Sequence, residues 1–243
     1  MQWMKLNYLA DKIDMATDKD AVREWITEKG YGHILNEKYA VYKSVAAIYP
    51  KSLASQFVLK AAHGSGWNLI VKDKTKVNWT IWKMNIRNLL KSNIYWDGRE
   101  NVYKNLKPKL IYEKYLEDSS GFLMDYRFHC FAGKPYCVPT NVGKGTTTHT
   151  QNFYDLNWEL LPFGKEIAYD WRILIDKPSQ LSDMVNMASD DSKEFSYMRV
   201  DFYEVNSNTI FGKMTFFPAS GLPDFVPKHY DAIWGQLLKL PIN

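Results

Sequence analysis

The chain has 243 residues, of which 46% are hydrophobic and 24% are charged, a composition ordinary for a globular protein with a sizeable core. Its net charge of +4 is too small and too scattered for a nucleic-acid-binding surface, which needs clustered basic residues. No stretch approaches about 18 consecutive apolar residues, and the N-terminus lacks the apolar region of a signal peptide. We therefore expect a cytoplasmic protein without a membrane span.

The first elements predicted are a helix and a hairpin. Thr17 begins a sequence that resembles a capping box, and apolar residues at helical spacing after it predict a helix ending at Gly30. Residues 56–60 and 67–72 predict two strands joined by a tight loop at residues 63–66. This strand–loop–strand unit differs from the strand–loop–helix unit of a P-loop or a dinucleotide-binding turn.

The remaining elements alternate between hairpins and helices. A helix is predicted over residues 78–90, with an apolar stripe of Ile81, Trp82, Ile86 and Leu89. Further strands are predicted at residues 109–116, 123–131, 134–140 and in a hairpin over 199–217, and further helices at 178–195 and 228–238. Residues 141–152, rich in glycine and threonine, are expected to form a mobile loop. Strands joined as hairpins outnumber helices, so the predicted fold class is α+β with antiparallel sheets.

The two cysteines, Cys130 and Cys137, flank a turn at Gly133 and are expected to be cross-strand neighbours. Without an export signal, reduced buried thiols are favoured over a disulfide. Two cysteines at this spacing do not make a zinc site.

The hairpin near the C-terminus carries the residues most suggestive of chemistry. Its first strand places Arg199 and Asp201 on one face among aromatic residues, and its second strand contains Lys213. An arginine beside an aspartate suits phosphate and a divalent metal, although the same pair also occurs as a structural ion pair.

Several residues along the chain form an ordered set, which consists of Lys19, Lys60, the loop 63–66, residues 113–116, Asp125, Arg199 and Asp201. In this order the set resembles the ATP-grasp ligases, and it is most similar to their TupA-like branch, which is linked to teichuronopeptide and capsular polysaccharide synthesis. The resemblance covers residues 8–241, and its most specific stretches are residues 16–24, 57–66, 152–158 and 199–203. It implies a two-lobe ATP-grasp fold, with residues 1–112 and 113–243 as the lobes and the nucleotide bound between them.

The resemblance implies phosphate contacts from the first lobe. Lys19 and Lys60 would supply positive charge to the nucleotide phosphates. The loop Gly64-Ser65-Gly66 would bring backbone N–H groups against the β- and γ-phosphates, because glycine permits close approach. His63 either contacts the substrate or forms a hydrogen bond within its own loop.

The resemblance also implies where the nucleoside binds. Glu113, Lys114, Tyr115 and Leu116 resemble the hinge between the lobes, where backbone groups contact the adenine edge and apolar side chains flank the ring. A carboxylate beyond the hinge would hydrogen-bond to the ribose hydroxyls. Asp125 and Glu117 are both candidates for this role.

At the C-terminal hairpin the chain departs from the family. Arg199 would stabilise the transferred phosphoryl group and Asp201 would bind Mg²⁺, but the family glutamate that bridges two Mg²⁺ ions is replaced by Lys213. Like charges a few ångströms apart repel by about 1–4 kcal/mol at effective dielectric constants of about 80 to 20. We expect Lys213 to pair with Asp201 or to contact the phosphates, and turnover to be impaired or to need only one metal ion.

The function implied is ATP-dependent joining of a carboxylate to an amine through an acyl phosphate, with ATP and Mg²⁺ as cofactors. The carboxylate would belong to a uronic acid of a surface polysaccharide or its precursor, and the amine to an amino acid. Lys144 and His149 in the glycine-rich loop are expected to meet this acidic acceptor and to help exclude water. Few residues precede Lys19, so we also expect a minimal enzyme completed by a partner chain.

Two other functions are weighed against this one. Lys213 favours a nucleotide- or glycan-binding protein without catalysis, retained as the partner of a glycosyltransferase. Glycosyl transfer by the chain itself is disfavoured, because no Asp-x-Asp metal motif lies in a suitable loop. Binding of ATP as opposed to a UDP-sugar would separate the ligase function from glycosyl transfer.

Overall fold

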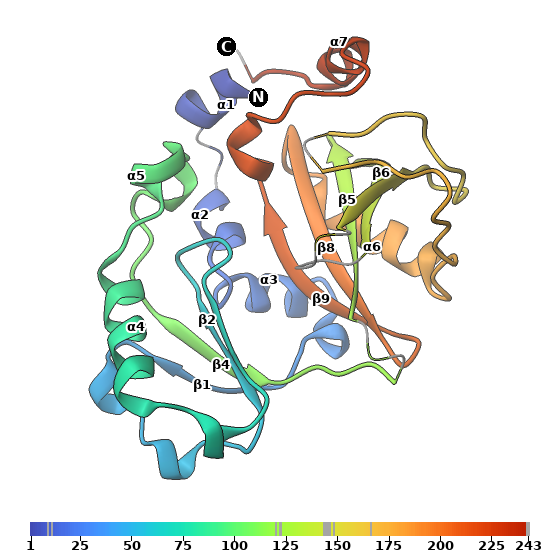
Figure 1. Ribbon diagram of the computed structural model, residues 1–243. Coiled ribbons are helices and arrows are strands. Elements are labelled where there is room, and N and C mark those ends of the chain that lie inside the picture. The colour runs from blue at the N-terminus through green and yellow to red at the C-terminus, as the bar shows by residue number, and fades with distance from the viewer. Residues whose placement is uncertain are drawn as a thin grey trace. The chain divides into compact units, whose positions relative to one another are not determined.

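The structure, a computed structural model, describes residues 1–8, 10, 12–119, 121, 123–142, 147, 149–165 and 167–241 (Figure 1). The chain forms two compact units. The N-terminal unit is Lys5–Leu116, and the C-terminal unit is Glu117–Asn243 together with Met1–Met4. Each unit contains one antiparallel sheet with helices beside it, which confirms the predicted α+β class. None of the helices in the described ranges is long and apolar enough to span a membrane.

The N-terminal unit is built on a four-stranded sheet with the order β1-β4-β2-β3. The strands are β1 (Lys38–Tyr42), β2 (Phe57–Ala61), β3 (Asn68–Val71) and β4 (Leu110–Lys114). The helices that begin or lie in this part of the chain are α1 (Gln2–Asn7), α2 (Ile13–Thr17), α3 (Val22–Glu28), α4 (Trp79–Lys91) and α5 (Tyr95–Gly98). Alternate residues of β2, such as Phe57 and Leu59, pack with Trp82 and Ile86 of α4 in one core.

Three details of the N-terminal unit differ from the predictions. The N-cap of α3 is Ala21, whose side chain makes no capping hydrogen bond. The Thr17 hydroxyl donates to the carbonyl of Ile13, and Oδ1 of Asp18 accepts hydrogen bonds from the backbone N–H groups of Asp20 and Ala21 in the turn before α3. The apolar stripe predicted for α4 included Ile81, but this side chain is 52% exposed. β1 was not predicted, and its residues are only partly buried, so they lack a strong alternating pattern.

The C-terminal unit is built on a five-stranded antiparallel sheet with the order β7-β6-β5-β8-β9. The strands are β5 (Met124–Phe131), β6 (Lys134–Val142), β7 (Thr150–Tyr154), β8 (Tyr197–Val205) and β9 (Asn208–Thr215). The helices are α6 (Leu181–Ser192) and α7 (His229–Leu237). α6 packs on one face of the sheet, where Cys130 reaches the carbonyl of Ala188. The predicted hairpins and both helices are confirmed.

The prediction for residues 141–152 was wrong in part. Thr150 to Tyr154 form β7, which pairs with β6, so the connection between these strands is shorter than expected. Lys144 lies outside the described residues, whereas His149 lies within them. Cys130 and Cys137 are buried free thiols on β5 and β6, as predicted. They are not directly opposite each other, because the register pairs Cys137 with His129 and Cys130 with Pro135.

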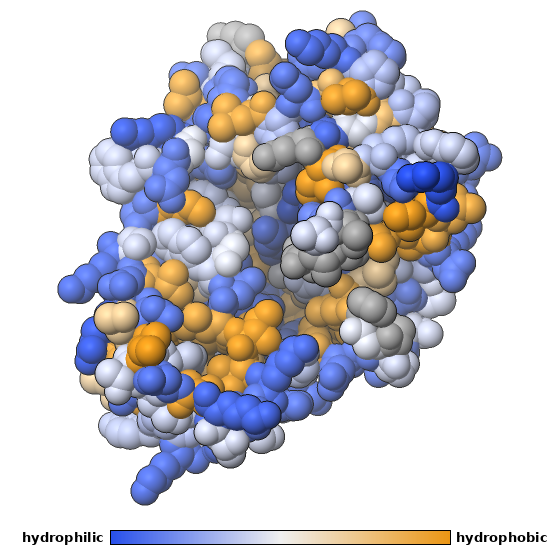
Figure 2. Space-filling model, viewed as in Figure 1, coloured by the Kyte–Doolittle hydropathy of each residue, from blue (hydrophilic) through white to orange (hydrophobic). Residues whose placement is uncertain are grey.

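Strand register gives the C-terminal sheet one polar and one apolar face. Arg127 lies opposite Asp201, and His129 lies opposite Arg199, so these four side chains share a face. Residues between them, such as Phe128 and Val200, point to the other face and are fully buried. On the face of the molecule drawn in Figure 2, hydrophilic residues predominate and hydrophobic residues lie among them in several separate patches.

A β-bulge at Gly212 sets the register of the polar face. Asp201 pairs with Lys213 and the next residue, Phe202, pairs with Phe211, so Gly212 is the extra residue. A Cβ at Gly212 would lie 2.8 Å from the backbone oxygen of Asp201, a contact that backbone cannot accommodate without moving. The bulge therefore places Lys213 opposite Asp201 and requires glycine beside it.

We expect Gly212→Ala to lower the free energy of unfolding by about 1–3 kcal/mol, because the hairpin must shift to admit the methyl group. Gly235→Ala is the matched control, since a Cβ at this helical glycine meets nothing within 4 Å. It should be neutral or stabilising by about 0.5–1 kcal/mol. Urea unfolding of both variants measures the difference, and equal stabilities would contradict the bulge argument.

Candidate functional site

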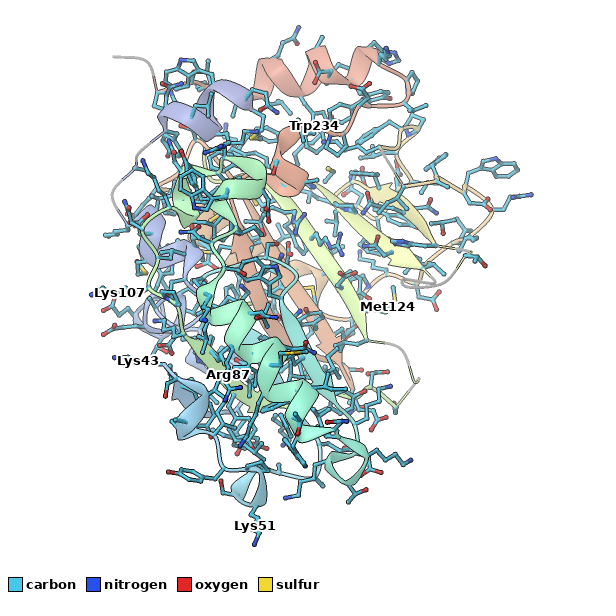
Figure 3. All side chains as sticks on the ribbon, turned by 60° about the vertical axis from the view of Figure 1, so that its left-hand side comes forward. Lys43, Lys51, Arg87, Lys107, Met124 and Trp234 are labelled. Atoms are coloured by element: carbon cyan, nitrogen blue, oxygen red, sulfur yellow. The ribbon has the colours of Figure 1, made fainter. Side chains whose placement is uncertain are left out.

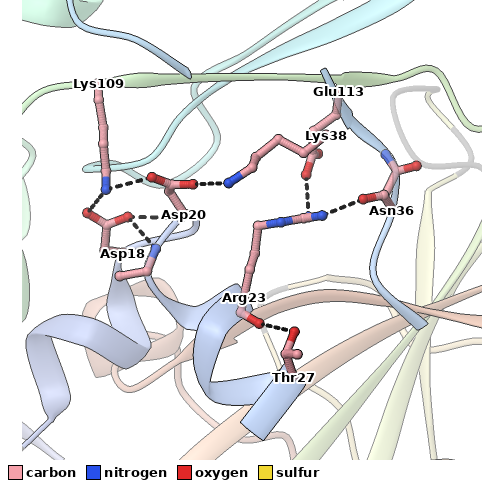
Figure 4. Close-up of polar contacts among 9 residues, drawn as sticks. Asp18, Asp20, Arg23, Thr27, Asn36, Lys38, Lys109 and Glu113 are labelled. Atoms are coloured by element: carbon pink, nitrogen blue, oxygen red, sulfur yellow. Dashed lines mark hydrogen bonds and ion pairs between the residues drawn. The ribbon is translucent and has the colours of Figure 1, made fainter. Parts of the chain in front are cut away.

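Glu113 on β4 is the centre of a buried ionic cluster in the N-terminal unit (Figure 4). Its Oε2 lies 2.7 Å from Nζ of Lys60, and its Oε1 accepts a hydrogen bond of 3.0 Å from NH1 of Arg23. The Arg23 guanidinium also donates to the carbonyl of Asn36. β2 and β4 are antiparallel neighbours, so Lys60 and Glu113 point to the face opposite the α4 core. The predicted residues Lys60 and Glu113 are therefore brought together, with Arg23 as a partner that the sequence did not reveal.

A second ionic cluster surrounds the start of α3 (Figure 4). Nζ of Lys109 lies 3.0 Å from Oδ2 of Asp18 and 3.1 Å from Oδ2 of Asp20, and Lys38 lies 2.7 Å from Oδ1 of Asp20. Burial opposes charge on Asp20, but hydrogen bonds from Lys38 and Lys109 hold its pKa below the ordinary value. Burial likewise opposes charge on Lys109, whose pKa the two aspartates nevertheless raise. The cluster fixes the segment that carries Lys19.

Lys19 stabilises the glycine loop. Its ammonium donates to the carbonyl oxygen of Ala61, at 2.8 Å, and to that of Gly64. Gly64 lies under the indole of Trp67, where a Cβ would come within 2.4 Å of the ring, and Gly66 has a φ of +74°. Ser65 and Gly66 form the more exposed end of the loop. The structure thus places Lys19 against the inner side of a loop that only glycine can form.

His63 is buried beneath the same loop. Its Nε2 lies 3.0 Å from the carbonyl oxygen of Leu89, and its Nδ1 accepts a hydrogen bond from the N–H of Lys109 at 3.3 Å. Burial lowers its pKa, so the neutral ring donates from Nε2 and accepts at Nδ1. Of the two roles considered for His63, this geometry is that of a hydrogen bond anchoring the loop.

The segment predicted as the hinge consists of the last two residues of β4, Glu113 and Lys114, and of Tyr115 and Leu116 after it. The N–H of Lys114 donates to the carbonyl of Glu37 at 3.0 Å, and the side chain of Asn36 donates to the carbonyl of Lys114 at 2.9 Å. The backbone of Lys114 is therefore hydrogen-bonded to the segment that precedes β1. The ammonium of Lys72 lies 5.8 Å from the centre of the Tyr115 ring, and Leu116 follows it.

In the C-terminal unit, Arg199 and Asp201 form a bidentate ion pair. Nε and NH2 of Arg199 donate to Oδ1 and Oδ2 of Asp201, each at 2.7 Å. NH2 also lies 3.5 Å from the hydroxyl of Thr215, which faces Arg199 from β9. Burial opposes charge on Arg199, but Asp201 raises its pKa, so the guanidinium is firmly protonated. Lys213 lies opposite Asp201 on the neighbouring strand.

Asp201 is the residue predicted to hold a Mg²⁺ ion. No group of three or more carboxylate, histidine or cysteine side chains suited to a metal occurs among the described residues. Asp201 supplies one carboxylate, and an ammonium stands on the strand position opposite it. Because Mg²⁺ is usually held by one or two carboxylates together with substrate phosphates, Asp201 fits a metal ion that arrives with a nucleotide.

Asp125 belongs to a hydrogen-bonded network on the same polar face. Its Oδ2 accepts a bond of 3.0 Å from Nε of Arg127, and its Oδ1 accepts one of 3.3 Å from Asn141. The side-chain oxygen of Asn141 lies 2.9 Å from Nε2 of His149 and 3.2 Å from the amide nitrogen of Gln151. The predicted residues Asp125 and His149 are thus linked through Asn141, whereas the alternative Glu117 is exposed.

A cavity of about 120 Å³ opens on the polar face beside Arg199. Three cations line it, Arg127, Lys165 and Arg199, together with His129 and Gln151. Lys165 was missed in the sequence because it lies in an irregular segment after β7, with no motif around it. A cavity lined by several cations on a rigid sheet is an anion-binding arrangement.

A sequence model described as TupA-like ATPgrasp matches residues 1–239 of the chain. Among solved structures, the fold is similar to D-alanine–D-alanine ligase from Bacillus anthracis complexed with ATP, with a TM-score of 0.54 and 12% sequence identity. That match covers 94% of this chain and 67% of the ligase. A second structure of the Bacillus anthracis ligase has a TM-score of 0.51 at 18% identity and covers 92% of this chain and 65% of that one. No curated protein sequence matches the chain.

Proposed function

Because the chain belongs to the TupA-like ATP-grasp family, we propose that it is an ATP-dependent carboxylate–amine ligase. The observation that carries the proposal is the buried Arg199–Asp201 pair beside a cationic cavity. A guanidinium at this position would stabilise negative charge on a phosphoryl group in transfer. Asp201 would bind Mg²⁺ together with the nucleotide phosphates, after Arg199 turns from the carboxylate towards the phosphoryl group.

The N-terminal unit would bind the nucleotide. Lys60 would contact a phosphate while it remains near Glu113, and Lys19 would support the loop at residues 64–66 whose N–H groups face the phosphates. Since Lys114 is hydrogen-bonded to Asn36 and Glu37, we assign the adenine contacts to the backbone of Tyr115 and Leu116. Asp125 is our choice for the ribose hydroxyls, because it is held in place by two hydrogen-bond donors.

The reaction would have two steps. A carboxylate oxygen of the acceptor attacks the γ-phosphorus of ATP, and the bond from this phosphorus to the β-phosphate oxygen breaks, giving an acyl phosphate and ADP. The amine nitrogen then attacks the acyl carbon, phosphate leaves, and the amine proton is lost, giving an amide. The acceptor proposed is a uronic acid of a surface polysaccharide or its precursor, and the amine is that of an amino acid, as the resemblance to the TupA-like branch implies. We place the proposed ligase in the cytoplasm, because it would use ATP.

The second candidate is a nucleotide- or glycan-binding protein without turnover that acts beside a glycosyltransferase. Lys213 opposite Asp201 is the observation that favours it, since an ammonium cannot ligate Mg²⁺ and repels it.

Calorimetric titration of ATP, with and without Mg²⁺, combined with an ADP-release assay, separates these candidates. For a ligase we expect Mg²⁺-dependent ATP binding, and ADP release only when a uronic acid and an amino acid are both present. ATP binding without ADP release across a panel of acceptors would support the second candidate. Failure of ATP to bind under any condition would contradict both.

A further inference from the structure

The cationic cavity of the C-terminal unit adjoins a second, aromatic cavity. The second cavity has a volume of about 210 Å³ and shares Lys165, Pro218 and Pro223 with the first. Its remaining walls include Phe131, Phe225 and Trp234. Lys165 therefore stands where a small cationic space meets a larger one with flat apolar walls.

The charge in the cationic cavity is unbalanced by about one unit. Arg127 is paired with Asp125 and Arg199 with Asp201, so both guanidinium groups have a counterion. Lys165 has no carboxylate within ion-pair distance in the described part of the chain. Its ammonium lies instead over the rings of Phe225 and Trp234, at 4.0 and 4.6 Å from their centres. Asp231, which lines the aromatic cavity, acts on Lys165 only from beyond ion-pair distance, so an anionic group of a ligand could pair with the ammonium directly.

The groups around Lys165 shift its pKa in opposite directions. Burial lowers the pKa of Lys165 to about 8, Arg199 acts in the same sense, and Cys137 and Asp231 oppose them. Burial, with Lys165, Arg199 and Arg127, also holds the pKa of His129 well below its ordinary value. An ammonium is therefore present at neutral pH beside a neutral imidazole.

His129 offers a hydrogen-bond donor in the same wall. Its Nδ1 lies 2.6 Å from the hydroxyl of Tyr197, whose pKa is raised by burial, so the phenol keeps its proton. With this phenol donating to Nδ1, the neutral ring carries its own proton on Nε2. A neutral N–H and an ammonium suit the two oxygens of a carboxylate.

Trp234 on α7 (Figure 3) lines the aromatic cavity and carries a hydrogen-bond donor of its own. It is 7% exposed, and its indole N–H is buried without an acceptor within the described residues. Buried donors in native proteins nearly always find a partner, so this one calls for an oxygen atom from water or a ligand. Flat rings beside such a donor suit a ring that carries hydroxyl groups.

The sizes of the two cavities suit a ligand made of a carboxylate group and a ring. The cationic cavity, at about 120 Å³, is the smaller of the two and would take the carboxylate group. The larger aromatic cavity would take the ring to which the carboxylate is attached.

We propose that these two cavities bind the acceptor as a sugar acid, with its carboxylate on Lys165 and His129 and its ring against Phe225 and Trp234. The assignment rests on the proposed function, since it places the carboxylate beside Arg199, where that function puts phosphoryl transfer. Lys165 is then the residue that selects a carboxylate, and Trp234 the residue that selects an oxygen-bearing ring.

Binding of D-glucuronate in the absence of ATP tests the proposal, with D-glucose and inorganic phosphate as comparison probes. We expect glucuronate to bind, glucose and phosphate to bind at least about tenfold more weakly, and Lys165→Met to reduce glucuronate affinity about tenfold. Lys193→Met, at an exposed lysine, is the matched control and should change nothing. The Lys165→Met side chain keeps the apolar contact with Phe225 and Trp234, so the variant should fold.

Two further readouts separate this role from a structural one. Affinity of the wild-type chain should fall about tenfold between pH 7 and 9.5, as Lys165 loses its proton, whereas Lys165→Arg should bind equally at both. In a ¹H–¹⁵N spectrum, the indole signal missing from Trp234→Phe should shift when glucuronate is added to the wild-type chain.

Unchanged glucuronate affinity in Lys165→Met would overturn the proposal, as would phosphate binding as tightly as glucuronate or a stationary Trp234 signal. Absence of glucuronate binding from a chain that binds ATP would overturn it too, while leaving the ligase function standing. Loss of ATP binding, in contrast, would count against the ligase function itself.

Discussion

Glu113→Ala should lower the free energy of unfolding of the N-terminal unit by about 3–5 kcal/mol. The Glu113 side chain is 6% exposed and neutralises two cations, Lys60 at 2.7 Å and Arg23 at 3.0 Å. Removing it leaves both charges in a poorly hydrated position, and their desolvation is no longer offset by attraction. Urea unfolding, followed by circular dichroism, measures the loss.

The adjacent residue provides the control. Lys114 forms an ion pair with Glu37 at 3.4 Å, but both side chains are more than half exposed. Water screens such a pair, so Lys114→Ala should cost less than about 1 kcal/mol. Glu113→Gln, which keeps the shape and loses the charge, covers the case in which Glu113→Ala does not fold. If Glu113→Gln and Lys114→Ala lower the free energy of unfolding equally, burial does not make the Glu113 ion pairs more stabilising than an exposed pair.

Lys213→Glu should raise the affinity of Mg²⁺ for the ATP-bound chain at least about tenfold. Register places residue 213 opposite Asp201, so the substitution replaces a repelling ammonium with a second carboxylate beside the first. Repulsion between like unit charges at these separations is about 1–4 kcal/mol, and about 1.4 kcal/mol already changes an equilibrium constant tenfold. Calorimetric titration of Mg²⁺ into the chain with ATP present measures the change.

Lys134→Glu controls for the change in net charge, since Lys134 is an exposed residue at the start of β6. It should leave the Mg²⁺ affinity unchanged. If Lys213→Glu also leaves it unchanged, Lys213 does not oppose a metal ion, and the expectation that this lysine weakens Mg²⁺ binding is wrong. If ADP release rises in Lys213→Glu while ATP affinity stays constant, the lysine limits turnover and not nucleotide binding.

Local patterns in the sequence determined most of the elements. Short apolar stretches bounded by turn residues identified β2, β5 and β8. Apolar residues at helical spacing identified α3, α4 and α6, because burial of one helix face leaves a period in the sequence. The ordered set of charged and glycine residues identified the family, which the match to residues 1–239 confirms. The assigned roles of the individual site residues remain predictions.

The tertiary structure decided which charged groups meet. Arg23 and Glu113 are 90 positions apart and Lys109 and Asp20 are 89 apart, so no local pattern links the members of these pairs. The same holds for Lys165, whose surroundings come from β6, β8 and α7. Sequence periodicity records which side of an element is buried, whereas the partner of a buried charge is set by strand order and register. The candidate ligand contacts of this protein join residues far apart in the sequence, so strand order and register determine them.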